Sequence, residues 1–149
     1  MVLNKFEIER AIWHLRRTYK PTDKDDFRDE VMKGTRELER IGKPVLPRLI
    51  SLLLNKNESV DLRGRIPGIL ANIGDPIAIA PLIQNLHEPN VFIRWSVVKG
   101  LGKLADSSLI PELERMVAED TGEFPIARSM TLTIKDAAKE AIEKIKARQ

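Results

Sequence analysis

The sequence predicts an all-α protein in which short helices stack in pairs into a right-handed α-α superhelix, a solenoid of about eight helices. Two observations predict this fold: a segment that recurs along the chain, and apolar residues at helical spacing within each copy. The composition agrees, because 42% of the 149 residues are hydrophobic but only 5% are aromatic. A core of mainly aliphatic side chains suits packed helices, and the length suits a single domain over residues 1–149.

The repeat is clearest between residues 62–75 and residues 93–106, which begin 31 positions apart. Both copies begin with an apolar residue followed by arginine, and both end with an apolar residue, a small residue and aspartate. A third copy begins at Ile134, 41 positions after the second, because about ten additional residues precede it. Units of this kind cannot bury their apolar faces alone, so neighbouring copies must stack.

Each copy is expected to form a helix with one apolar face, which we call a B helix. The stripes of the last two B helices are Ile93, Val97, Val98, Leu101 and Leu104, and then Ile134, Ala137, Ala138, Ala141, Ile142 and Ile145. Shorter helices between them, the A helices, carry stripes of their own. These are Val45, Leu46, Leu49, Ile50 and Leu53; Ile79, Leu82, Ile83 and Leu86; and Leu109, Ile110, Leu113, Met116 and Val117.

Capping residues stand at the expected helix starts. Asp75 followed by Pro76 is typical of an N-cap and a first helical position, and Asp106 occupies the same place one repeat later. Thr133, with Asp136 three residues on, resembles a capping box for the last B helix. We therefore expect three repeats, at residues 44–74, 75–105 and 106–147.

Residues 1–43 are less regular, as terminal repeats of a solenoid are expected to be. We predict two helices there, over residues 4–19 and about 25–41, that form a degenerate capping pair, with a break at residues 20–23 between them. Trp13 is expected to be structural. The candidates for the buried sides are Phe6, Ile12, Leu15 and Tyr19 in the first helix and Phe27, Val31, Leu38 and Ile41 in the second.

Residues 73–82 carry the pattern Ile-Gly-Asp-Pro-x-Ala-Ile-x-Pro-Leu and precede a further B helix that begins with an apolar residue and arginine. This pattern resembles the HEAT-like repeats of the phycobilisome-lyase type, which have an armadillo-type fold. The resemblance covers roughly 100 residues. It implies the solenoid fold, but fold alone does not assign an activity, because such repeats occur in bilin lyases and in scaffold proteins.

The residues that usually carry chemistry are scarce. The chain has no cysteine and only two histidines, His14 and His87, which excludes thiolate catalysis and cysteine-ligated metals. No nucleophile motif, glycine-rich phosphate loop or metal-ligand spacing is present. We therefore expect no cofactor, no metal and no enzymatic activity. Because no apolar run is long enough to span a bilayer and the N-terminus does not resemble a signal peptide, we expect a soluble cytoplasmic protein.

Basic residues recur at one position of the repeat. Arg63 and Arg94 follow the first apolar residue of their B helices, and Lys135 occupies this place in the third copy. One interpretation is a basic ladder that binds an anionic partner. The alternative is that each cation pairs with an aspartate of a neighbouring repeat, such as Asp75, and fastens adjacent repeats together.

Charge also differs between the two sets of helices. The segments that contain B helices carry a net charge of +6, while those around the A helices total −5. If B helices line the concave side, that side is basic, with Arg65, Lys99 and Lys103 among its cations. The alternative is a chance scatter of charge over solvated helices.

The insertion at residues 119–130 interrupts the last repeat, and long loops in compact domains are often functional. Phe124 and Ile126 either contact a partner or fold back over the end of the core. Trp95 lies beside the stripe of its helix. It is either an exposed interface anchor or a filler between repeats.

The function predicted from these patterns is a scaffold that binds a protein partner through the basic face of the B helices. A second hypothesis is binding of nucleic acid, including a DNA-repair role in which Trp95 and Asp136 meet an extruded base. A third, implied by the resemblance, is an accessory subunit similar to those of bilin lyases. The sequence does not identify the partner or the oligomeric state.

Overall fold

The computed structural model describes residues 5–18 and 26–149, and in this part of the chain it contains eight α-helices and one β-hairpin. This confirms the predicted all-α repeat fold. Three short 3₁₀ helices, η1 (Lys43–Val45), η2 (Pro76–Ala78) and η3 (Ser107–Leu109), precede α3, α5 and α7. The other elements are α1 (Lys5–Leu15), α2 (Asp26–Ile41), α3 (Leu46–Leu54), α4 (Val60–Ile73), α5 (Ile79–Gln84), α6 (Val91–Leu104), α7 (Ile110–Glu119), β1 (Glu123–Ala127), β2 (Met130–Thr133) and α8 (Ile134–Ala147).

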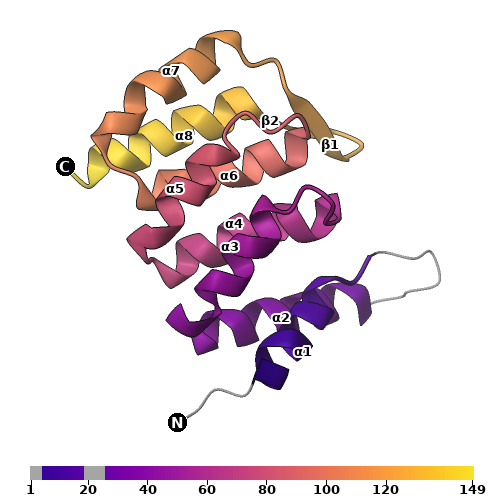
Figure 1. The fold of residues 1–149 in the computed structure, drawn as a ribbon. Helices are drawn as coiled ribbons and strands as arrows, with labels where there is room; N and C mark the ends of the chain where they lie inside the picture. Colours follow the sequence, from indigo (N-terminus) through magenta and orange to yellow (C-terminus); the bar gives the residue numbers. More distant parts are fainter. Residues whose placement is uncertain (1–4, 19–25) are drawn as a thin grey trace.

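The helices stack as a solenoid of pairs, with the N-terminal pair at the bottom of Figure 1 and the C-terminal pair at the top. The B helices α4, α6 and α8 pack against one another in that order, and α2 contacts α4. The A helices α3, α5 and α7 each pack against the B helix that follows them. Each B helix in the middle of the array therefore has neighbours on two sides within its own layer.

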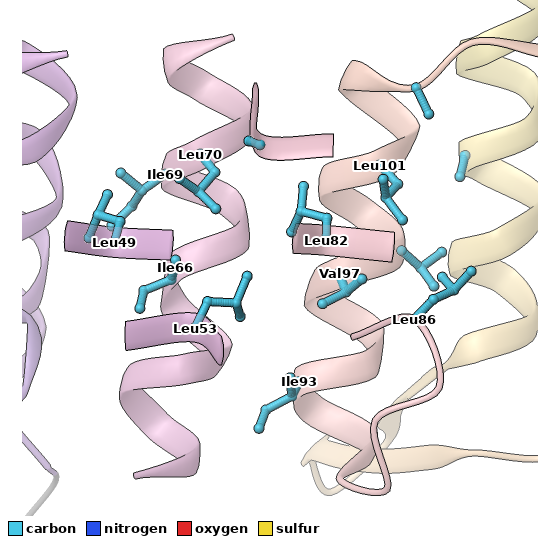
Figure 2. Close-up of a cluster of buried hydrophobic side chains, with 14 of the residues drawn as sticks. Leu49, Leu53, Ile66, Ile69, Leu70, Leu82, Leu86, Ile93, Val97 and Leu101 are labelled. Carbon is cyan, nitrogen blue, oxygen red and sulfur yellow. The ribbon is translucent and has the colours of Figure 1, made fainter. Parts of the chain in front are cut away.

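The core is a continuous row of aliphatic side chains between the two layers. Leu49 of α3 and Ile66 of α4 belong to this core, as do Leu82 of α5 and Val97 of α6 (Figure 2). All four are fully buried. Most of the predicted stripe residues belong to this core, although Ile83, on the outer side of α5, is 43% exposed.

Polar side chains begin the helices as predicted. The Asp75 carboxylate accepts a hydrogen bond from the backbone N–H of Ile77, and one repeat later the Asp106 carboxylate accepts one from the N–H of Ser108. Both residues cap the 3₁₀ turns that lead into the A helices. Thr133 accepts from the N–H of Asp136 and caps α8. Ser59 and Asn90, which the sequence analysis did not single out, cap α4 and α6.

The N-terminal pair differs in part from the prediction. Ile12 and Leu15 are buried against α2, but Phe6 and Trp13 are 65% and 57% exposed. These two residues lie two turns apart on the face of α1 opposite its packed side, so the burial predicted for Phe6 is wrong. The predictions for Tyr19 and for the break at residues 20–23 lie outside the described residues.

The insertion at residues 119–130 was predicted as a loop, and this is wrong in part. Strand β1 pairs with β2 in an antiparallel hairpin, with Phe124 opposite Leu132 and a register irregularity between Pro125 and Ala127. The segment forms a strand rather than a loop because the Phe124 ring packs against Phe92 and Trp95 of α6, and this contact holds one face of β1 in place. The hairpin ends at Thr133, and α8 begins at the next residue, Ile134.

Candidate functional site

An apolar groove lies between the B helices α4 and α6. Its volume is about 290 Å³. Its lining is mainly apolar, and the charged side chains on it are all cations: no carboxylate lines it in the described part of the chain. We call it the α4–α6 groove. It is formed by Gly64, Arg65, Gly68 and Ala71 of α4 and by Phe92, Trp95, Ser96, Lys99, Gly100 and Lys103 of α6.

Glycines on α4 give the groove its shape. A Cβ atom at Gly64 would lie 2.1 Å from the Phe92 ring, so only glycine lets this ring lie against α4. At Gly68 a Cβ atom would have no neighbour within 4 Å and would point into open space. The bare backbone of Gly68 is therefore the floor of the groove.

Two of the groove cations, Lys103 and Arg65, donate hydrogen bonds to neutral oxygen atoms. The Lys103 ammonium donates to the Oδ1 atom of Asn72 at 2.9 Å. The Arg65 guanidinium donates to the backbone carbonyls of Leu15 and Arg17, at 2.8 and 2.6 Å. Burial lowers the pKa of Arg65 from its usual value. Neither contact neutralises the charge of the cation that makes it.

Lys99 shares a carboxylate with a second lysine. Its ammonium and that of Lys144 both contact Glu140, at 2.8 and 2.6 Å, and their hydrogen bonds, with Lys144 first, lower the pKa of Glu140 to about 2. One carboxylate between two ammonium groups leaves this triad with a net charge of +1. The Lys99 ammonium also lies 5.5 Å from the centre of the Trp95 ring, within range of a cation–π interaction.

Arg63 does not belong to this surface. It is 3% exposed, and its guanidinium donates to the carbonyl of Leu53, to Asn85 and to Glu88, each at 2.9 Å. Glu88 follows the next A helix, so the pair links two repeats. The interpretation as part of a basic ladder is therefore wrong for Arg63.

Arg94 repeats this arrangement one unit later. Its guanidinium binds both carboxylate oxygens of Asp120, at 2.8 and 3.0 Å, and donates to the carbonyl of Glu88. For Arg94, as for Arg63, the alternative interpretation is therefore the correct one: the cation pairs with a carboxylate of a neighbouring repeat and fastens the two repeats together. The named partner was wrong, because Asp75 pairs with Lys43 instead. Lys135, the third member of the series, is exposed on α8.

The two hairpin residues play different parts. Phe124 is half-buried, and its ring makes edge contacts with the rings of Phe92 and Trp95, at centroid distances of 5.8 and 5.7 Å. Trp95 is itself half-buried and packs against the core. Ile126, in contrast, is 50% exposed near the tip. Phe124 thus joins the hairpin to the groove, while Ile126 projects from the hairpin.

The other polar groups offer little chemistry. His14 pairs with Glu30, and His87 lies 2.9 Å from Glu112. Asp136, suggested above as a partner of Trp95, is hydrogen bonded to Thr133 in the cap of α8. Residues 5–18 and 26–149 contain no group of three or more metal-ligating side chains placed to hold an ion. None of the helices described there is long and apolar enough to cross a membrane.

A family model described as HEAT repeats matches residues 46–131, which is more than half of the chain. The chain belongs to the HEAT repeat family. The matched segment of this HEAT repeat protein includes both walls of the α4–α6 groove and nearly all of the hairpin. The helices outside it, α1, α2 and α8, extend the stack at either end.

A solved structure with the same fold is the complex of CpcE and CpcF of phycocyanin lyase from a Nostoc species. It aligns with this HEAT repeat protein with a TM-score of 0.56 at 22% sequence identity. The alignment covers 99% of the present chain but only 55% of the matched chain of that complex, so the present chain spans about half the length of its match. No curated protein matches the chain. The predicted resemblance to repeats of the phycobilisome-lyase type is confirmed at the level of the fold.

Proposed function

We propose that this HEAT repeat protein is a non-catalytic interaction module that binds a protein partner through the B helices, with the α4–α6 groove as the central contact. The observation that carries the proposal is the chemistry of the groove: an apolar floor beside Trp95, edged by Arg65, Lys99 and Lys103. Concave apolar sites with a few placed polar groups are typical binding sites. Tryptophan and arginine are also enriched among the residues that dominate binding energy.

The size of the groove supports a protein partner. A volume of about 290 Å³ holds one or two large side chains rather than a whole cofactor. Burying one such side chain contributes about 1.5–3 kcal/mol, so stable binding also requires contacts along the rest of the B-helix face. Lys135 on α8 and Ile126 on the hairpin extend the proposed contact area beyond the groove. That the neighbouring structure is a complex of two lyase subunits further supports a protein partner.

A pair of Gly68 variants tests the proposal. Gly68→Trp fills the groove, whereas Gly68→Ala adds one methyl group in open space and stabilises α4 by about 0.5–1 kcal/mol. Each variant is immobilised and used to capture partners from the native cell with and without nuclease, and captured proteins are then purified and titrated. We expect a partner that survives nuclease, binds Gly68→Ala like the wild type and is lost with Gly68→Trp.

Three outcomes would contradict the proposal. Equal binding to both variants would exclude the groove as the contact. Loss of all binding after nuclease treatment would favour the nucleic-acid hypothesis. Binding of a linear tetrapyrrole by the wild type in place of any protein would favour an accessory role like that of bilin lyases.

A further inference from the structure

The geometry points to an acidic peptide segment with one apolar anchor residue as the occupant of the α4–α6 groove, an inference that rests on the proposed function. The anchor, an aliphatic or aromatic side chain, lies over Gly68. Carboxylates on either side of it in the peptide contact the cations at the edges of the groove. Three features of the described residues support this choice of partner.

The floor requires an apolar anchor. Gly68 and Ala71 expose little more than backbone and methyl groups, and the rings of Phe92 and Trp95 form the opposite side. A charged or strongly polar group placed here would lose its hydration without gaining hydrogen bonds, which is unfavourable. Phe124 packs against the Phe92 ring from outside the groove lining and supports this side of the floor.

The edges carry a net positive charge. Lys103 and Arg65 donate to neutral oxygens, and the triad of Lys99, Lys144 and Glu140 retains a charge of +1. A ligand carboxylate beside the low-dielectric floor is attracted more strongly than it would be in bulk water. The cations lie on both walls, Arg65 on α4 and the lysines on α6, so an anchor between them is flanked by positive charge on two sides.

The directions of the lysines place the charges of the peptide further. Lys99 and Lys103 are four residues apart on α6, but their ammonium groups reach to opposite sides of this helix, Lys99 to Glu140 on α8 and Lys103 to Asn72 on α4. We therefore expect one acidic residue of the peptide beside Lys103, next to the anchor, and another at Lys99, on the side of the peptide that faces α8.

Nucleic acid fits the same surface less well. A phosphate backbone requires a track of cations, whereas the groove places an apolar floor between its cations. The Trp95 ring, a potential platform for base stacking, is already in edge contact with Phe124. Duplex DNA is therefore an outcome of the test rather than the proposed ligand.

The test is a selection of short random peptides, displayed on phage, on the full chain and in parallel on Gly68→Trp. All peptides enriched on the wild type, whether or not Gly68→Trp also enriches them, are synthesised with a fluorescent label and titrated by anisotropy. We expect them to contain an aliphatic or aromatic residue flanked by aspartate or glutamate. We also expect at least about tenfold weaker binding to Gly68→Trp and to Lys99→Gln/Lys103→Gln, and weaker binding as salt is added.

The matched control is Lys139→Gln/Lys146→Gln, which removes two charges from the surface between α7 and α8. This variant and Gly68→Ala are expected to bind like the wild type, and thermal melting confirms that all variants are folded. Peptides that need an open groove but lack acidic residues, or that bind the Lys99→Gln/Lys103→Gln variant normally, would overturn the inference and leave the proposed function standing. Peptides that bind Gly68→Trp equally well, or labelled duplex DNA that competes for the groove, would overturn both.

Discussion

Two arginines at equivalent positions show how one residue type serves the fold in successive repeats. Arg63 and Arg94 both reach forward to a carboxylate beyond the next A helix, Glu88 in one case and Asp120 in the other. Both guanidinium groups also bind backbone carbonyls, so each of them satisfies oxygen atoms where helices end. Lys103 donates to the neutral side chain of Asn72 instead, and Lys99 shares its carboxylate with Lys144, so both lysines retain positive charge for a partner.

Removing the Arg63 side chain is expected to destabilise the protein strongly. Arg63→Ala leaves the Glu88 carboxylate buried with one fewer cation and deprives Leu53 and Asn85 of a donor. Losing one partner of a buried ion pair costs about 3–5 kcal/mol. Urea denaturation measures the change, and Lys135→Ala, an exposed change, is expected to alter stability by less than about 0.5 kcal/mol. A loss below about 1 kcal/mol for Arg63→Ala would contradict the structural role.

The same ion pair predicts how stability depends on pH. The hydrogen bond from Arg63 holds the pKa of Glu88 below the usual value for glutamate. Stability contributed by a depressed carboxyl pKa is fully present above the unfolded pKa and is lost as the pH falls through the folded one. We expect the free energy of unfolding to fall below about pH 4.5 and to fall less steeply in Glu88→Gln. Parallel curves for the two proteins, from denaturation at pH 3–7, would show that Glu88 contributes nothing.

For single residues, the sequence shows which positions recur in the repeat more reliably than it shows which groups those residues contact. The recurrence of Arg63 and Arg94 is visible in the repeat, but their acceptors are not, because Glu88 and Asp120 lie 25 and 26 residues further on. An A helix separates each arginine from its acceptor in the sequence, and the two side chains come together only once that helix is folded. The exposure of Phe6 was equally hidden, because an apolar residue on a helix does not reveal which neighbours the helix has.

The hairpin is the element in which this molecule departs from a plain helical repeat. Its base is fixed by the pair between Asp120 and Arg94 and by the N–H of Ile134 donating to the carbonyl of Gly122. Its first strand places Phe124 against two rings of α6. The insertion is thus attached to two rings that line the groove, and Ile126 near its tip is exposed.

Truncating Phe124 is expected to expose Trp95. In a Trp13→Phe background, which leaves Trp95 as the single tryptophan, Phe124→Ala removes the ring at 5.7 Å. We expect a red shift of the emission and stronger quenching by acrylamide, with a loss of stability of about 1–2 kcal/mol, because the ring is only half-buried. Ile126→Ala, a change at the exposed tip, serves as the control and is expected to alter neither signal. Unchanged emission of Phe124→Ala would mean that the hairpin does not cover Trp95 in solution.

The boundaries of the elements followed from the sequence where two signals agreed. For α8 the apolar stripe and the Thr133 cap coincide, and the helix begins at Ile134 as predicted. The hairpin was missed because Pro125 disfavours a strand and because Phe124 forms one only against rings that are distant in the sequence. The groove was missed for a similar reason, since Gly68 faces a groove only because side chains of α6, distant in the sequence, form its other wall.

As a whole, the molecule is a one-dimensional stack in which each helix pair has only its neighbours for support. The middle B helices α4 and α6 contact partners on both sides, while α1 contacts α2. In such arrays stability is roughly a sum of intrinsic repeat terms and nearest-neighbour terms. Stability should therefore vary along the array, with the best-supported units in the middle.

Hydrogen exchange is expected to follow this gradient. Amides of α4 and α6 should exchange most slowly, and those of α1 should exchange fastest among the helices, because local opening requires the loss of fewer contacts at an end. Exchange followed by mass spectrometry on peptides from each helix measures the order. Protection of α1 equal to that of α6 would contradict a solenoid supported by neighbours alone.

The forward reach of Arg63 to Glu88 also bears on how such an array changes its length. Because each arginine finds its carboxylate in the unit that follows, the contact belongs to the junction between two units rather than to either one. A unit duplicated in frame would carry an arginine for the next junction and a carboxylate for the preceding one. The chain can therefore grow by whole units without designing a new interface, and copies that lack either residue would form the weak points at which the array divides.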